Sequence, residues 1–326
     1  MEKKMNRRDF LRATATTGIV LVSGDFLRGF SWAKGVVRIP ESEKIVISVI
    51  TDNYADFLRK DYKIAKRPVG TSPLDRIFHA EHGLAYQIET VVNGESHFCL
   101  FDFAVDPHGV IRNMKLLNID FAKIEAFGLS HPHFDHFNAL NEILKAYKDS
   151  IRKGIPFYVG EQFFVTIGGI PLKRGDIEGL GLVKLMEIKE PTPIIPGAYL
   201  PGKIELITDY ETKQEILIGE QAVILNAKGK GLVVVSGCAH RGIVNTVRKA
   251  QKMTGIEKVF AVMGGFHLIN AHPEVIKKTV ADIKAINPEH IIPMHCTGFE
   301  GISAFAREMP DQFIVNTAGT KYIITG

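Results

Sequence analysis

The chain has 326 residues, 45% of them hydrophobic and 23% charged, a composition typical of a globular protein and not of a disordered one. Its formal net charge is +4, most of which comes from the first 33 residues, so the remainder is nearly neutral. No basic stripe is evident, and we therefore expect no nucleic-acid partner. Three cysteines form an odd, sparse set that argues against a disulfide framework.

The amino-terminal segment is predicted to be a targeting signal. Residues 6–12 read NRRDFLR, which is similar to a twin-arginine export signal; an apolar stretch covers residues 13–22, and Ser31-Trp32-Ala33 offers a cleavage site. The apolar stretch is too short for a permanent membrane anchor. We expect residues 1–33 to direct export through the twin-arginine translocase to the periplasm or another extracytoplasmic compartment, where an uncleaved signal would tether the protein. A basic amino-terminal helix is the alternative.

The mature chain is predicted to form one domain over residues 34–326. Apolar or alternating runs predict strands over residues 44–50, 84–89, 97–103, 123–129 and 156–160. A helix is expected to begin near His136, because apolar residues recur at helical spacing from Ala139 to Leu144. Residues 161–209 are rich in glycine and proline, so we predict an insertion that caps or frames the active site, with an extended loop as the alternative.

Regular periodicity resumes after residue 209. Strands are predicted over residues 222–226, 232–236, 258–263, 290–293, 312–315 and 321–325, and helices near residues 243–255, 276–287 and 302–309. Strands cluster early in the chain and later alternate with helices. This order indicates a two-sheet α/β core with helices on its outer faces.

Residues 131–136 read His-Pro-His-Phe-Asp-His, which places four side chains that can bind metal in six positions. Alternate residues of an extended loop point the same way, so His131 and His133 can share one metal while Asp135 and His136 turn toward a second. Imidazole and carboxylate ligands suit zinc, iron or manganese, and two adjacent metals make a hydrolytic centre. A polar surface loop with incidental histidines is the alternative.

This loop resembles the HxHxDH motif of the metallo-β-lactamase superfamily, a four-layer αββα sandwich of metal-dependent hydrolases, and the resemblance extends from about residue 44 to the end. Asp102 resembles the strand-terminal aspartate that supports the metal loop from behind, and His295 resembles the late histidine that binds the second metal. The resemblance implies two divalent metals, zinc being preferred over manganese or iron. It also implies that Asp135 is a catalytic residue that orients the nucleophile as well as a ligand.

Two positions depart from the superfamily pattern. The bridging aspartate falls on Cys238, and no histidine lies between His136 and His240, where a third motif is usual. We therefore predict that His240 is a metal ligand, and that Cys238 either bridges as a thiolate or lies nearby as a neutral thiol. His267 is a catalytic candidate that could bind metal, position substrate or act as an acid; a structural histidine is the alternative.

Further motifs resemble one branch of the superfamily, named after a dihydropterin–ribofuranosylaminobenzene-phosphate synthase of methanopterin biosynthesis. They are EHGL at residues 81–84, SGCAHRGI at 236–243, GGFHL at 264–268 and HCTG at 295–298. The preferred prediction is a metal-dependent hydrolase-like enzyme acting on a small-molecule ester, lactone or phosphoester. The alternatives are a pterin-related synthase or transferase, an iron-dependent oxidoreductase, and a non-catalytic exported protein that binds a metal or ligand.

Overall fold

The computed structural model describes residues 36–69, 72–164, 172–211 and 217–326. The predicted export signal at residues 1–33 lies outside these ranges, so export stays a prediction. No helix within them has the length and apolarity that crossing a bilayer requires.

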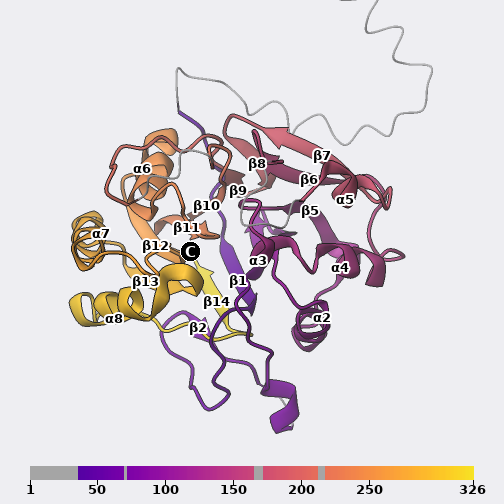
Figure 1. Cartoon of the computed structure of the whole chain (residues 1–326), viewed down its shortest axis with the longest axis horizontal. Coiled ribbons are helices and arrows are strands. Elements are labelled where there is room, and N and C mark those ends of the chain that lie inside the picture. Colours follow the sequence, from indigo (N-terminus) through magenta and orange to yellow (C-terminus); the bar gives the residue numbers. More distant parts are fainter. Residues whose placement is uncertain (1–35, 70–71, 165–171, 212–216) are drawn as a thin grey trace, which may run out of the picture.

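Two β-sheets pack face to face, with helices on the outer face of each, so the predicted four-layer αββα arrangement is confirmed for the described residues (Figure 1). The larger sheet has the order β2-β14-β1-β3-β4-β5-β6-β7 and the smaller sheet has the order β13-β12-β11-β10-β9-β8. The strands of the larger sheet are β1 (Lys44–Thr51), β2 (Ala65–Lys66), β3 (Ala85–Val92), β4 (Glu95–Phe103), β5 (Ile124–Gly128), β6 (Ile155–Gly160), β7 (Val183–Ile188) and β14 (Lys321–Thr325). Those of the smaller sheet are β8 (Thr192–Ile195), β9 (Ala198–Leu200), β10 (Ala222–Ala227), β11 (Gly231–Ser236), β12 (Val259–Gly265) and β13 (His290–Met294).

The central core lies between the sheets. Ile45, Ile47 and Val49 alternate along β1 and pack in one cluster with Val233 and Val235 of β11. Because side chains alternate between the faces of a strand, a slip of one residue would turn these apolar groups away from the core. Burial therefore fixes the register that brings the functional strand ends to one edge.

Helices complete the outer layers, as Figure 1 shows. Those on the larger sheet are α2 (Pro107–Leu116), α4 (Leu140–Ala146) and α5 (Arg174–Glu178), and those on the smaller sheet are α6 (Ile243–Thr254), α7 (Pro273–Ile286) and α8 (Gly298–Glu308). Short helical turns are η1 (Pro73–Arg76), η2 (Phe121–Lys123), α3 (Phe134–Phe137) and η3 (His295–Thr297). The sequence reading missed α2, although Asp106 caps its first N–H groups and Pro107 occupies its first turn.

Two segments differ from their predictions. Within 161–209 the described residues form α5, β7, β8 and β9, so much of this stretch belongs to the two sheets. Pro193 lies in β8, and the sheet tolerates it there because β8 is an edge strand. The predicted strand at 312–315 is reduced to a single bridge between Phe313 and Ile291. Whether residues 161–209 are an insertion relative to similar proteins stays a prediction.

Candidate metal centre

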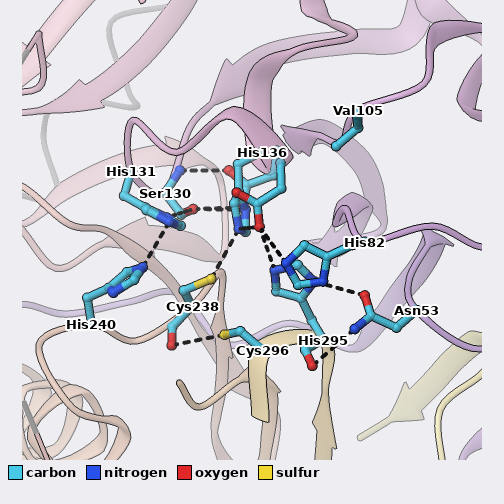
Figure 2. A network of polar contacts seen from close by, with 12 residues as sticks. Asn53, His82, Val105, Ser130, His131, His136, Cys238, His240, His295 and Cys296 are labelled. Atoms are coloured by element: carbon cyan, nitrogen blue, oxygen red, sulfur yellow. Dashed lines mark hydrogen bonds and ion pairs between the residues drawn. The ribbon is translucent and has the colours of Figure 1, made fainter. Parts of the chain in front are cut away.

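The predicted site residues meet where strands of the two sheets end. β4 and β5 run parallel in the larger sheet, as do β11, β12 and β13 in the smaller one, so the loops after them gather at one edge. Figure 2 shows His131 and His136 from the loop after β5 facing Cys238 and His240 from the loop after β11, with His295 alongside. The structure thus brings together residues that lie more than 100 positions apart.

Asp102, at the end of β4, fixes the ring orientations of His131 and His136 in the loop after β5. Its buried carboxylate accepts 2.7 Å hydrogen bonds from the N–H and Oγ–H of Ser130 and from Nδ1–H of His136. Ser130 Oγ in turn accepts from Nδ1 of His131 at 2.8 Å. Both histidines therefore direct Nε2 toward the centre. Gly237 permits this network, because a Cβ there would lie 2.2 Å from Ser130 Oγ.

One candidate ligand set consists of His131, His133, Cys238 and His240. His131 Nε2 lies 3.1 Å from His240 Nε2, and the ring centroids of His133 and His240 are 4.6 Å apart. The ligand atoms of His131, Cys238 and His240 all lie within 4.8 Å of one another. Burial lowers the pKa of His133 to about 4 and, with neighbouring imidazoles, lowers those of His131 and His240 well below the ordinary histidine value. The rings are neutral near pH 7, the form that binds cations.

The second candidate set consists of Asp135, His136, Cys238 and His295, whose ligand atoms also lie within 4.8 Å of one another. Asp135 Oδ2 lies 3.1 Å from His295 Nε2, and His136 Nε2 lies 3.2 Å from Cys238 Sγ. Burial disfavours the charged form of His136, but the carboxylates of Asp102 and Asp135 outweigh burial and raise its pKa to about 9. A cation bound here would displace that proton.

Two buried carboxylates that the sequence reading missed hold the remaining loops. Glu220 accepts the backbone N–H groups of His240 and Arg241, each at 2.7 Å, and Asp52 accepts the backbone N–H of His295 at 3.0 Å. Neither carboxylate belongs to a local motif, so the only available signal was an acidic residue at the border of a predicted strand.

His267 and His82 stand beside the two sets. The ring centroid of His267 lies 3.9 Å from that of His240. His82 stacks on His295 and places Nε2 3.5 Å from Asp135 Oδ2. Both histidines help to line a cavity of about 260 Å³, together with His133, Phe134, Asp135, Cys238, His240, Ile269 and Cys296. His82 belongs to the EHGL motif of residues 81–84, which the structure places at the rim of this cavity.

The donor set fits divalent cations. Buried imidazoles with oriented Nε2 atoms, one carboxylate and one shared thiol converge beside a cavity, and Asp102 supplies the supporting hydrogen bonds that histidine ligands usually have. The number and identity of bound ions stay predictions.

Comparison with known proteins agrees with this architecture. The chain is 36% identical to the 7,8-dihydropterin-6-methyl-4-(β-D-ribofuranosyl)-aminobenzene-5′-phosphate synthase of Methanocaldococcus jannaschii over 262 residues, 72% of this chain and 87% of that protein. It is 28% identical to an uncharacterized protein of the same organism over 253 residues, 71% of this chain and 89% of that protein. No family model matches the chain.

Solved structures show the same fold. Tm1679, a metal-dependent hydrolase of the β-lactamase superfamily, superimposes with a TM-score of 0.66 at 22% identity, covering 86% of this chain and all of that one. The metallo-β-lactamase fold protein YhfI from Bacillus subtilis gives 0.51 at 12% identity, covering 85% and 99%. The chain therefore has a metallo-β-lactamase fold and belongs to the family of the Methanocaldococcus jannaschii 7,8-dihydropterin-6-methyl-4-(β-D-ribofuranosyl)-aminobenzene-5′-phosphate synthase.

Proposed function

We propose that this protein is a metal-dependent hydrolase-like enzyme that acts on a small-molecule ester, lactone or phosphoester. One observation carries the proposal: two adjacent ligand sets share Cys238 beside a cavity that His133, Asp135 and His240 also line. His131, His133 and His240 would hold one divalent cation, and Asp135, His136 and His295 a second, with zinc the first candidate and manganese or iron the others.

When bound, the cations supply Lewis acidity and a water activated for attack near neutral pH. The chain contributes orientation and proton transfer. His295 and His136 lower the pKa of Asp135 below its usual range, although burial opposes this shift, so this residue is a carboxylate ready to accept a hydrogen bond from the nucleophile. Burial disfavours the charged form of His267, but the contact with Cys296 outweighs burial and raises the pKa of His267. His267 would therefore donate a proton to the leaving oxygen.

Replacing His131 and His133 with alanine tests the proposal. We expect the purified double variant to lose the metal content found in the wild type and all turnover of a panel of esters, lactones and phosphodiesters. His108→Ala provides the control, because His108 is exposed on α2, outside both ligand sets, and should leave both measurements unchanged. Wild-type metal content in the double variant would contradict the proposed site.

A pterin-related synthase is the second candidate, because a protein with that name is 36% identical over most of its length. The test is direct: the metal-replete protein is incubated with a 4-(ribofuranosyl)aminobenzene 5′-phosphate and a dihydropterin whose 6-methylene carbon carries a diphosphate leaving group, and joined product is sought by mass spectrometry. Product formed in the absence of hydrolytic turnover would favour the synthase.

Metal analysis separates the remaining candidates. Zinc or manganese near two per chain supports hydrolysis, whereas iron near one supports an oxidoreductase. A metal-replete protein that turns over no substrate in either assay would support a non-catalytic exported binding protein.

We further propose that residues 1–33 direct export through the twin-arginine translocase. The pair Arg7-Arg8 carries this proposal. Replacing both arginines with lysine should leave the protein in the cytoplasm, as measured by cell fractionation; unchanged export would contradict it.

A further inference from the structure

A third group of ligand atoms lies beside the two sets described above. Sγ of Cys238, Sγ of Cys296 and a ring nitrogen of His267 all lie within 4.8 Å of one another. The three residues follow the neighbouring strands β11, β13 and β12, and all three line the 260 Å³ cavity. Cys296 and His267 belong to neither of the other sets, whereas Cys238 is common to all three.

The backbone is shaped to bring these groups together. Gly265 lies where a Cβ would approach Cys296 Sγ to 2.6 Å and the carbonyl oxygen of Gly237 to 2.4 Å, so a side chain there would push the sulfur away. His267 adopts a left-handed conformation with φ of 47°, which a histidine occupies at a cost in energy. Such strain persists where surrounding contacts enforce it and is common at functional sites.

Packing alone accounts poorly for this group. Nδ1 of His267 is buried and has no hydrogen-bond partner among the described residues. Sγ of Cys296 contacts the side chains of His267 and Cys238 and lies a long 3.6 Å from the carbonyl oxygen of Cys238, visible in Figure 2. Cys99 offers the contrast: it is wholly buried in the apolar layer between the sheets. A thiol serving only as a small apolar side chain belongs in such a layer, not between a histidine and a second thiol at a cavity wall.

We propose that Cys238, Cys296 and His267 form an additional cation position, suited to thiophilic divalent ions such as zinc, cobalt and cadmium. Two thiolates and one imidazole make a soft set with room for a fourth ligand from the cavity. Each thiol loses a proton when the ion binds, and Cys238 can bridge this position to the neighbouring imidazole sets. The position goes beyond the proposed function, since hydrolysis does not require Cys296. An ion bound here would take the ring nitrogen of His267 that otherwise carries the proton for the leaving oxygen, so the two uses of His267 exclude each other.

Cobalt titration of the full-length, metal-free protein tests the proposal, because thiolate ligation of Co²⁺ gives a strong near-ultraviolet charge-transfer band. We expect Cys296→Ser to lose about half of that band, one of two thiolates having been removed. In the variant that lacks the imidazoles of His131 and His133, the band should persist, and adding Cys296→Ser should reduce it again. The control is Cys99→Ala, which should leave the band unchanged.

A band of equal intensity in wild type and Cys296→Ser would overturn the proposal. Cadmium NMR of the wild-type protein gives an answer independent of any variant's folding, because the chemical shift reports the number of thiolate ligands. A resonance from a two-thiolate site supports the assignment, and spectra showing at most one thiolate per cadmium overturn it. The thiolate band is expected even in the variant that lacks the imidazoles of His131 and His133. Failure of this proposal can therefore be told apart from failure of the proposed hydrolase.

Discussion

The loop after β5 and the loop after β11 hold their histidines in different ways. In the first loop a buried carboxylate reaches a ring itself: Asp102 accepts from Nδ1 of His136 and, through Ser130, orients His131. In the second loop the carboxylate of Glu220 reaches only the backbone of His240, whose Nδ1 has no hydrogen-bond partner among the described residues. Ring orientation is thus built into the first loop, whereas only loop position is built into the second.

This difference predicts unequal consequences when each support is weakened. Asp102 sets both the tautomer and the direction of its histidines, so its loss should affect metal binding and stability together. Glu220 fixes only the position of the loop, and a bound cation can still orient the ring of His240. Isosteric substitutions of the two carboxylates measure these contributions separately.

The largest effect is expected for Asp102→Asn. The amide would direct an N–H group at Nδ1 of His136, forcing its proton onto Nε2, the atom that should bind metal. We expect metal affinity to fall roughly 10–100-fold and the free energy of unfolding to fall by about 3 kcal/mol, because a buried carboxylate–histidine pair is broken. Calorimetric zinc titration and denaturant unfolding measure the two quantities.

Glu125→Gln is the matched control for that variant. Glu125 and His97 form another carboxylate–histidine contact, at 3.0 Å, but it is partly exposed and lies away from both ligand sets. This substitution should cost less than about 1 kcal/mol and leave zinc affinity unchanged. Equal losses of zinc affinity in the two variants would show that the orienting role assigned to Asp102 is wrong.

The loops also explain how much could be predicted from sequence. Motifs of adjacent residues, such as His131 to His136, were found because loop geometry alone places their side chains together. His240 and His295 were found through a resemblance that supplies the order of motifs along a fold. Glu220 and Asp52 were missed because their roles exist only after distant strands have packed. The helix α2 was missed despite its Asp-Pro start, a local signal that was available.

A second effect, of intermediate size, is a pH dependence of the metal-free protein. His136 has a folded pKa of about 9, above its unfolded value near 6.5, so its stabilising contribution is complete below pH 6.5 and disappears as the pH rises through 9. His131 and His240 have lowered pKa values, so their neutral folded forms lose stability as the pH falls below 6.5.

The metal-free melting temperature should therefore be highest near pH 6.5 and fall on both sides. Thermal unfolding in the presence of chelator, from pH 5 to pH 9.5, measures it. Asp102→Asn should reduce the alkaline limb, because His136 depends on that carboxylate for its raised pKa. The part of this limb due to His267, whose pKa is also raised, and the acid limb should both remain. An unchanged alkaline limb in this variant would contradict the assignment.

The smallest effect is expected for Glu220→Gln. One of the two 2.7 Å hydrogen bonds to the N–H groups of His240 and Arg241 would be replaced by opposed donors, at a cost of about 1–3 kcal/mol in the free energy of unfolding. Glu211→Gln is a matched control. Glu211 likewise accepts two consecutive backbone N–H groups, those of Val244 and Asn245, but neither of these residues is a candidate ligand. Both variants should lose similar stability, whereas only Glu220→Gln should weaken zinc binding, and by less than Asp102→Asn does. A larger zinc defect in Glu220→Gln than in Asp102→Asn would reverse the comparison, because it would mean that loop position, and not ring orientation, limits how the centre holds its ions.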